Sequence, residues 1–315
     1  MSTSRKALVT GGAGFIGSHL VRRLLREGYS VRVLDDLSTG KESNLEEVKR
    51  DVELTVGDIR DLEMVSKAAL GASCIWHQAA LASVPRSVKD PAQTHGVNAT
   101  GTLNVLLAAK AKSVPRVVLA SSSSVYGETP TLPKVETMPP CPISPYAAQK
   151  LTNELYAKQF HLHYGITTVC LRYFNVFGPR QDPNGPYAAV IPCFVKRIRG
   201  GEAPLIHGTG EQSRDFTYVD NTVEANLLAS NAEGVGGEAF NIATSQPITI
   251  QHLAESVAEW LGWDGGIDHG PARPGDILHS YADISKAREL LGYEPQVGFD
   301  EGLNRTLKWF AERPL

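Results

Sequence analysis

A glycine-rich stretch near the start of the chain decides the fold class: ALVTGGAGFIGSHL, residues 7–20. An apolar run before the glycines predicts a strand, and apolar residues at helical spacing after them, as far as Glu27, predict a helix. The glycines fit both GxGxxG and GxxGxxG, through Gly11, Gly12, Gly14 and Gly17. Glycines at such a turn let the backbone approach a pyrophosphate, and the helix N-terminus offers N–H donors. The stretch therefore predicts a dinucleotide-binding turn.

An acidic residue follows the glycines at the expected distance. Asp35 lies 18 residues after Gly17, at the end of a second apolar run. A carboxylate there can accept hydrogen bonds from both ribose hydroxyls of NAD, and it would repel the 2′-phosphate of NADP. The next two residues are Asp36 and Leu37, so no arginine is present there to accommodate that phosphate. We therefore expect NAD as the cofactor.

Strand and helix signals alternate through the first half of the chain. Further strands are expected at Ser30 to Leu34, Val52 to Val56, Cys74 to His77, Arg116 to Ala120 and Thr167 to Tyr173. Helices are expected at Val88 to Lys112 and from Ser144-Pro145 to about Tyr164. Such alternation predicts an α/β fold with a doubly wound parallel sheet. Polar and small residues that follow strand ends should then share one edge, where ligands bind: Asp35, Asp58, Ala79, Ser121, Ser122 and Asn175.

The residue composition changes near Phe177, where Pro and Gly become frequent. We expect an NAD-binding domain over residues 1–176 and a smaller lobe over residues 177–315. The lobe should contain the segments Ala188 to Gly200, Asn221 to Asn231 and Ile250 to Leu261. A short strand signal suggests that the chain returns to the first domain around residues 237–245.

Composition excludes several classes of protein. The chain has 315 residues, 42% hydrophobic and 21% charged, with a net charge of −3, which is typical of globular proteins. It has no basic run for nucleic acid and no apolar stretch long enough to span a membrane. The cysteines are far apart and form neither a CxxC pair nor a metal set: Cys74, Cys141, Cys170 and Cys193. We expect reduced thiols in a cytoplasmic protein without a metal.

Two side chains on the expected second helix are candidates for proton transfer. Tyr146 and Lys150 lie four residues apart, so both project from one helical face. A free phenol has a pKa of about 10, and a nearby ammonium together with a positive nicotinamide would lower that pKa. Taken alone, this spacing fits a surface tyrosine beside a solvated lysine better than a catalytic pair. The serine run at residues 121–124, after a strand, adds a hydroxyl that can bond the same substrate hydroxyl.

In this order, the motifs resemble those of the NAD-dependent epimerase/dehydratase family, within the extended short-chain dehydrogenase/reductase superfamily. The resemblance covers essentially the whole chain and is strongest to UDP-hexose 4-epimerases, especially those acting on UDP-N-acetylglucosamine. The matching stretches are TGGAGFIG (10–17), LDDLSTG (34–40), GDI (57–59), HQAALASVPRS (77–87), SSSSVYG (121–127), SPYAAQK (144–150), RYFNVFGPRQDPNGPYAAVIP (172–192), GEQSRDFTYV (210–219) and RPGD (273–276). It implies a Rossmann-type sheet with a smaller α/β substrate-binding lobe at the C-terminus.

The resemblance also implies residue roles. Tyr146 becomes the base, Lys150 its partner, and Ser122, or else Ser123, the serine that bonds the reacting hydroxyl. Implied cofactor contacts are Gly11, Gly14, Phe15, Ile16, Gly17, Asp35, Asp36, Ser38, Gly40, Asp58, Ile59, Gln78, Ala79, Ala80, Asn98, Tyr146, Lys150 and Tyr173. Implied substrate contacts are Ser83, Ser122, Ser123, Tyr146, Asn175, Ala189, Val190, Arg214, Arg273, Asp276 and Ser280, with both arginines on the diphosphate and Asp276 on the uridine ribose.

The implied reaction is 4-epimerisation of a UDP-sugar through a transient 4-keto sugar. Family 4,6-dehydratases carry an acid pair after the active threonine, whereas this chain has Ser123 and Ser124 there, which disfavours dehydration. A tyrosine seven residues after the arginine of RPGD would narrow the sugar pocket, and here that residue is Ser280. We therefore expect UDP-GlcNAc/UDP-GalNAc, with UDP-Glc/UDP-Gal also accepted. UDP-glucuronate 4-epimerisation and a non-catalytic NAD-sensing role are the alternatives, and a homodimer built on the two long helices is implied.

Overall fold

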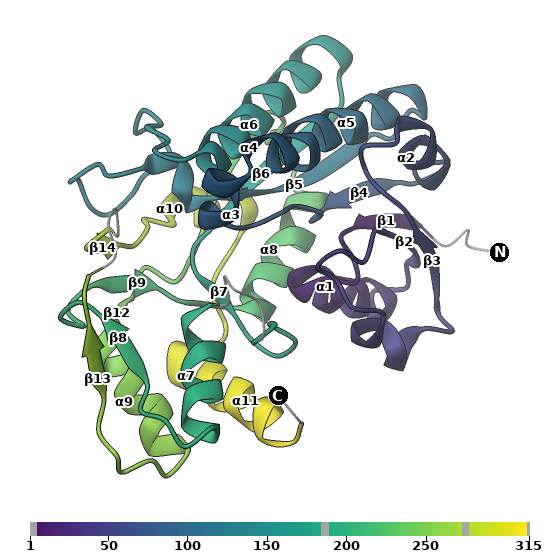
Figure 1. Ribbon diagram of the computed structural model, residues 1–315. Helices are drawn as coiled ribbons and strands as arrows, with labels where there is room; N and C mark the ends of the chain where they lie inside the picture. The colour runs from purple at the N-terminus through teal and green to yellow at the C-terminus, as the bar shows by residue number, and fades with distance from the viewer. Residues whose placement is uncertain (1–4, 184–188, 273–276, 314–315) are drawn as a thin grey trace.

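The computed structural model describes residues 5–183, 189–272 and 277–313, and its largest element is a seven-stranded sheet (Figure 1). The strand order is β11-β6-β5-β4-β1-β2-β3, and every neighbouring pair is parallel. The strands are β1 (Lys6–Thr10), β2 (Ser30–Asp35), β3 (Val52–Val56), β4 (Cys74–His77), β5 (Arg116–Ser122), β6 (Thr167–Tyr173) and β11 (Glu238–Ile242). The first six match the expected strands to within two residues, and the doubly wound parallel sheet is confirmed.

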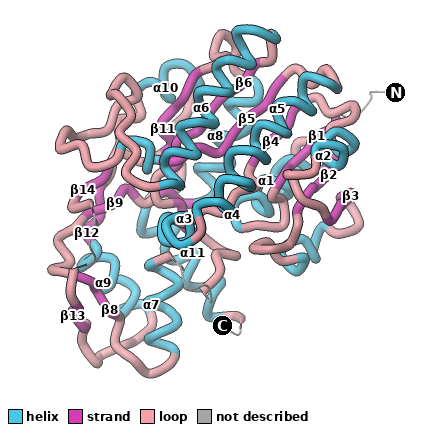
Figure 2. The backbone as a smooth tube through the Cα atoms, turned by 45° about the horizontal axis from the view of Figure 1, so that its top comes forward, coloured by secondary structure: helices cyan, strands magenta, loops and turns pink. Residues whose placement is uncertain are grey.

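Helices cover both faces of this sheet because successive strand residues point to opposite sides. On β5, Val117 and Leu119 pack in one hydrophobic cluster, and Val118 between them belongs to the other. The first cluster lies beneath α2 (Leu62–Ala68), α5 (Thr102–Ala111) and α6 (Pro145–Tyr164). Figure 2 shows α5 and α6 running side by side over that face. The opposite face is covered by α1 (Phe15–Arg26) and α8 (Val219–Asn231).

The long helix expected from Val88 to Lys112 is not continuous. The structure has α3 (Val84–Lys89), α4 (Pro91–His95), a π-helical turn η2 (Gly96–Gly101) and then α5. The break falls at Asp90, which has φ −140° and ψ 80° and accepts a hydrogen bond from the Gln93 amide as the cap of α4. Proline disfavours helical backbone in the residue before it, so Pro91 ends α3 and begins α4.

Two segments from the second half of the chain lie on the large sheet. The segment 221–231, expected in the smaller lobe, forms most of α8, which packs against α1, β5 and β6. Strand β11 pairs with β6 in parallel register, from Glu238 opposite Val169 to Ile242 opposite Tyr173. Helix α8 covers an apolar face of β5 and β6, whereas β11 extends the sheet through its pairing with β6. The expected place of this helix in the smaller lobe is wrong, because the periodicity of a helix does not indicate which elements it packs against.

The remaining residues build a smaller lobe next to the carboxyl ends of the strands (Figure 1). Its elements are α7 (Val190–Arg199), β8 (Leu205–His207), β9 (Ser213–Asp215), β12 (Pro247–Thr249), α9 (Ile250–Trp260), β13 (Asp268–Gly270), β14 (His279–Ser280) and α11 (Phe299–Ala311). Strands β7 (Val176–Phe177) and β10 (Thr217–Tyr218) join it to the sheet, α10 (Ser285–Leu291) packs on β11, and η1 (Glu42–Val48) and η3 (Ser123–Tyr126) are short turns.

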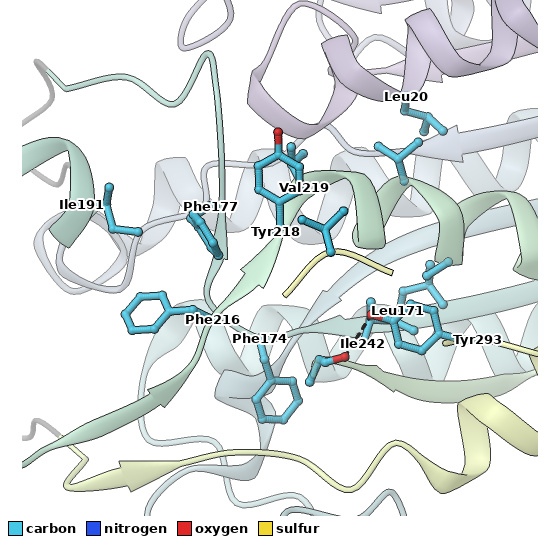
Figure 3. Close-up of a cluster of buried hydrophobic side chains, with 14 of the residues drawn as sticks. Leu20, Leu171, Phe174, Phe177, Ile191, Phe216, Tyr218, Val219, Ile242 and Tyr293 are labelled. Atoms are coloured by element: carbon cyan, nitrogen blue, oxygen red, sulfur yellow. Dashed lines mark hydrogen bonds between the residues drawn. The ribbon is translucent and has the colours of Figure 1, made fainter. Parts of the chain in front are cut away.

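One hydrophobic core connects the lobe with the sheet. Figure 3 shows Leu171 of β6 and Ile242 of β11 in the same cluster as Phe216, Tyr218 and Ile191 of the lobe and its junction. A shared core resists relative movement of the two parts, so the edge of the sheet and the lobe form a fixed frame. Among the described residues, no helix combines the length and apolar character that a membrane span requires.

Candidate active site

The glycine turn between β1 and α1 is packed so closely that it excludes side chains. A Cβ atom on Gly17 would lie 2.0 Å from the Gly11 carbonyl oxygen, and one on Gly11 would lie 2.5 Å from the Ala79 nitrogen. Gly11 also has φ +71°, a conformation that favours glycine. The turn therefore presents bare backbone at the N-terminus of α1. Helix N-termini of this kind attract phosphate through their free N–H groups and the helix dipole.

Asp35 closes the other side of this turn. It ends β2, is 6% exposed, and accepts hydrogen bonds from the Ala13 and Leu37 amides, at 2.9 Å each. Burial raises the pKa of the Asp35 carboxyl, and the two amides oppose that rise. A carboxylate has about four lone-pair sites, so each oxygen can still accept one hydroxyl. This geometry fits the expected pair of bonds to a ribose.

A cavity of 610 Å³ runs along the carboxyl ends of the strands from this turn. Its lining contains every cofactor contact implied by the sequence except Asn98, and it also includes Ser83. Asn98 lies instead beneath the loop after β4. Its side-chain oxygen accepts a hydrogen bond from the Leu81 N–H at 2.8 Å. Its side-chain nitrogen donates to the Leu81 carbonyl at 3.2 Å and to Gln149 at 2.8 Å. The structure thus places Asn98 behind the lining, where it holds Leu81.

Other expected cofactor contacts have well-defined partners at the lining. Tyr173 donates to Gln78 Oε1 at 3.1 Å, and Asn226 of α8 donates to Tyr173 at 2.8 Å. Asp58 accepts the Arg60 guanidinium and amide, and that hydrogen bonding lowers the pKa of the Asp58 carboxyl. The bare glycine turn, the buried Asp35 carboxylate and this continuous lining fit a dinucleotide.

Tyr146 and Lys150 both line this cavity. They lie on the first turns of α6, which begins after Ser144; the Ser144 hydroxyl accepts the Ala147 amide at 3.2 Å. Ser87 of α3 accepts the Tyr146 amide at 3.0 Å, so the start of α6 is fixed from two sides. Lys150 Nζ donates to the Ala120 carbonyl of β5 at 2.7 Å.

The serine run divides between two roles in the structure. The Ser122 hydroxyl hydrogen-bonds Tyr146 and accepts the Ser124 amide at 3.2 Å. Ser121, which lines the first cavity, donates through its hydroxyl to Glu154 Oε1 at 2.5 Å. Ser123 begins the turn η3. Of the four serines, Ser122 is therefore the one that shares a hydrogen bond with the candidate base.

Burial shifts the pKa of Tyr146 in the direction opposite to the effect expected from the ammonium and the nicotinamide. Burial raises the pKa of Tyr146 to about 12, and only the Ser122 hydrogen bond opposes the rise. Burial also lowers the pKa of Lys150 to about 8, although Cys170 and Glu154 oppose that fall. The cause is desolvation, which disfavours the charged form of each group. Sequence spacing cannot show how deeply the pair is buried.

A second cavity of 320 Å³ lies in the smaller lobe, next to the end of β6. It brings together four of the expected substrate contacts: Asn175, Ala189, Val190 and Arg214. Ser280 pairs with Arg214 across the β14–β9 register, so it lies beside this lining. Arg273 and Asp276 lie outside the described residues. The apolar wall is formed by residues that the sequence did not single out: Phe177, Ile191, Phe194, Leu205, Ile206, Phe216 and Ile250.

Several charged residues of the first cavity were also missed. Arg180 and Asp182 follow β7 and line the cavity, and Lys41 reaches Asp182 at 3.1 Å. The sequence signal was present, since both Arg180 and Asp182 fall in the stretch 172–192 that resembles the epimerases. Their position next to the loop after β2 could not be inferred, because that loop is distant in the sequence.

His77 is buried, and its ring nitrogens lie 2.7 and 2.8 Å from the hydroxyls of Thr10 and Thr102. The described residues contain no cluster that could hold a metal.

Comparisons with known proteins agree with this geometry. A UDP-glucose 4-epimerase from Mycolicibacterium smegmatis is 39% identical over 312 residues, covering 98% of this chain and 99% of that protein. A UDP-N-acetylglucosamine 4-epimerase structure from Methanobrevibacter ruminantium M1, in complex with UDP-N-acetylmuramic acid, has a TM-score of 0.93 at 43% identity, covering 98% and 99% of the two chains. A Thermus thermophilus UDP-glucose 4-epimerase complex with NAD has a TM-score of 0.88 at 38% identity, covering 97% and 99%.

The family profile described as "NAD dependent epimerase/dehydratase family" matches residues 7–243. That range includes the glycine turn, Asp35, the serine run and the Tyr146–Lys150 pair. The family uses NAD, and the cavity fits it. This chain belongs to the NAD-dependent epimerase/dehydratase family.

Proposed function

We propose that the protein is an NAD-dependent UDP-sugar 4-epimerase, an isomerase, that interconverts UDP-GlcNAc with UDP-GalNAc and also accepts UDP-Glc and UDP-Gal. The observation that carries the proposal is the hydrogen bond of Ser122 to Tyr146, which lines a dinucleotide cavity, with a second cavity in the lobe beside it. The similarity to UDP-sugar 4-epimerases supports the reaction class.

Tyr146, Ser122 and Lys150 have separate roles at the C4 hydroxyl of the sugar. NAD supplies the chemistry of removing and returning the C4 hydride. Tyr146 accepts the proton of the C4 hydroxyl, and Ser122 bonds the same oxygen and orients it. Lys150, held by the Ala120 carbonyl, stabilises negative charge on the Tyr146 oxygen. When the hydroxyl re-forms on the opposite face, Tyr146 returns the proton.

The second cavity anchors the nucleotide while the sugar turns. Asn175 and Arg214 line this cavity, and both are suited to phosphate oxygens. Ala189 caps α7 and Val190 begins it, and the first N–H groups of a helix can donate to the nucleotide. An anchor distant from C4 leaves the hexose free to present either face.

Two features support 4-epimerisation of N-acetylhexosamines over other reactions. Ser123 and Ser124 form part of η3, next to Ser122, and neither supplies the carboxylic acid that elimination of water requires. Ser280, paired with Arg214 in the lobe, has a small side chain that leaves room for a 2-acetamido group. The similarity to a UDP-N-acetylglucosamine 4-epimerase supports the same choice.

A product assay tests the proposal. The purified protein is incubated separately with UDP-GlcNAc, UDP-Glc and UDP-glucuronate, with and without added NAD, and the C4 configuration is read by proton NMR. We expect UDP-GlcNAc to convert to UDP-GalNAc. Conversion of glucuronate alone would keep the mechanism and contradict the substrate. No conversion of any sugar with NAD present would favour the non-catalytic NAD-sensing alternative.

We also propose a cytoplasmic homodimer, with a second copy of this chain on the outer surface of α3 and α6. Four apolar side chains there are exposed: Val88 (64%), Leu155 (58%), Tyr156 (41%) and Leu162 (61%). Helix faces of this kind are stabilised by burial against another helix pair. Light scattering at micromolar concentration should give twice the chain mass, and Leu155→Glu should reduce it to one. A monomeric wild-type protein would contradict the dimer.

A further inference from the structure

A chain of buried polar side chains runs behind the serine run. Arg172 of β6 forms a two-pronged ion pair with Glu154 of α6, at 2.7 Å to Oε2 and 2.9 Å to Oε1. Arg172 also donates to the Tyr126 hydroxyl at 2.8 Å, and Tyr126 donates to Asn241 of β11 at 2.7 Å. Glu154 is 9% exposed and Arg172 5%. Nothing in the proposed reaction uses this pair directly.

Glu154 reaches the candidate site in two ways. Its Oε1 accepts the Ser121 hydroxyl at 2.5 Å, and Ser121 is joined by one peptide bond to Ser122. On α6, Tyr146, Lys150 and Glu154 follow one another at intervals of four residues, so they share one helical face. Both carboxylate oxygens of Glu154 are held by Arg172, so its position relative to Lys150 is fixed.

We propose that Glu154, fixed by Arg172, is a positioning residue for the epimerase reaction: it locks Ser121 so that Ser122 faces Tyr146, and it places a negative charge behind Lys150. This inference rests on the proposed function for its kinetic part. The geometry links α6, β5 and β6 through one carboxylate. Small displacements of a hydroxyl that positions the substrate strongly reduce turnover, so fixing Ser121 should maintain a high kcat.

The groups around Lys150 determine the electrostatic part. Tyr146 and Glu154 face it from α6, Cys170 from β6, and His77 from the end of β4, and the Ala120 carbonyl of β5 accepts a hydrogen bond from it. His77 is neutral near pH 7, because burial lowers its pKa to about 3. The Glu154 charge raises the pKa of Lys150 against the larger effect of burial. Removing that charge should therefore let Lys150 lose its proton at lower pH.

The experiment compares three variants by kinetics and by the Lys150 titration. Lysine is labelled with ¹³C, the Lys150 Cε signal is assigned with Lys150→Arg, and its pH titration is followed by NMR. Glu154→Gln should move the Lys150 titration and the corresponding ionisation in kcat/KM to lower pH. Glu154→Asp keeps the charge and should retain the wild-type titration. Ser121→Ala keeps the charge but removes the lock, so it should lower kcat about tenfold with little change in KM.

The outcomes separate this inference from the proposed function. A folded Glu154→Gln protein with an unmoved Lys150 titration overturns the electrostatic part, and a Ser121→Ala protein with wild-type kcat overturns the lock. Thermal unfolding is recorded for every variant. If Glu154→Gln does not fold because Arg172 is left unpaired, Ser121→Ala and Glu154→Asp still decide the lock, since Glu154→Asp shortens the reach to Ser121. A wild-type protein inactive on every UDP-sugar contradicts the function, while the NMR titration still tests Glu154.

Discussion

Lys150 Nζ lies 5.8 Å from the centre of the Tyr146 ring, one helical turn along α6. Burial moves the pKa values of the two groups toward each other, with Tyr146 at about 12 and Lys150 at about 8. Lys150 keeps its positive charge below about pH 8, and a positive charge at this position would stabilise the phenolate form of Tyr146. Tyr146 can accept a proton from a sugar hydroxyl only in this phenolate form.

The first prediction concerns the pH dependence of kcat/KM. Below about pH 8 Lys150 keeps its charge, and the phenolate fraction of Tyr146, whose pKa is about 12, rises about tenfold with each pH unit; above that ionisation Lys150 loses the charge that stabilises the phenolate. We expect kcat/KM for UDP-GlcNAc to fall about tenfold for each pH unit below that ionisation, and to level off above it. Initial rates between pH 5 and 9 with saturating NAD would measure this. A rate that is flat across this range would contradict proton transfer through the pair.

The second prediction removes the base. Tyr146→Phe keeps the ring but loses the hydroxyl, so kcat should fall by at least ~100-fold while NAD is retained. Turnover is measured by proton NMR, and NAD is quantified after heat extraction. Tyr164→Phe is the matched control, because Tyr164 is 48% exposed at the end of the same helix and is not part of the cavity lining. Wild-type turnover in Tyr146→Phe would mean that another group takes the proton.

The parts of the fold that follow local rules could be predicted from sequence. The apolar runs that became β1 to β6 and the capped start of α6 at Ser144 depend on neighbours in the chain. Pro91 indicates a helix boundary at Asp90–Pro91, but the helical periodicity of the segment favoured one continuous helix. The assignment of α8 failed for a different reason: the face it covers is built by β5 and β6, far away in the sequence.

The candidate site shows the same division. Glycine spacing, Asp35 and the Tyr146–Lys150 pair could be found from local pattern, because their chemistry requires fixed distances along the chain. The ionisation of Tyr146 could not, because its pKa depends on burial by elements distant in sequence. The same limit applies to Ser121, whose partner Glu154 is 33 residues away and becomes visible only when β5 and α6 are packed together.

A third prediction tests the glycine turn. In Gly17→Ala, the new Cβ would lie 2.0 Å from the Gly11 carbonyl oxygen, so the turn must open. Overpacking of this kind lowers the free energy of unfolding by about 1–3 kcal/mol, and we expect weakened NAD binding as well. Urea unfolding and NAD titration by calorimetry would measure both. Gly298→Ala is the control, since a Cβ there meets nothing within 4 Å. Unchanged NAD affinity in Gly17→Ala would remove the turn from the cofactor site.

A fourth prediction concerns the ion pair between Lys41 and Asp182. These side chains come from the loop after β2 and the segment after β7, both of which line the first cavity. They meet at 3.1 Å, and the side chains are 51% and 42% exposed. Exposed pairs contribute ~0.2–1 kcal/mol, so Asp182→Asn should speed NAD dissociation by up to about fivefold. Raising the salt concentration should speed release in the wild type more than in the variant.

Stopped-flow displacement of NAD by an excess of a fluorescent analogue would give these dissociation rates. Glu63→Gln is the matched control, because it removes the exposed Lys67–Glu63 pair on α2, at 2.8 Å. If Asp182→Asn and Glu63→Gln release NAD at the same rate as the wild type, the Lys41–Asp182 pair does not hold the cofactor in place.

The last prediction tests the choice of sugar at Ser280. This residue ends β14 and pairs with Arg214, which lines the second cavity, so a larger side chain there extends toward the same space. Ser280→Tyr should lower kcat/KM for UDP-GlcNAc by at least ~10-fold, because a bulky ring competes with the 2-acetamido group for volume. UDP-Glc has only a hydroxyl at that position, so its kcat/KM should change much less. Ser280→Ala, which keeps the small volume, should leave both sugars as they are. Equal losses for both sugars in Ser280→Tyr would mean that the ring disturbs Arg214 and the nucleotide instead, and that Ser280 does not select the sugar.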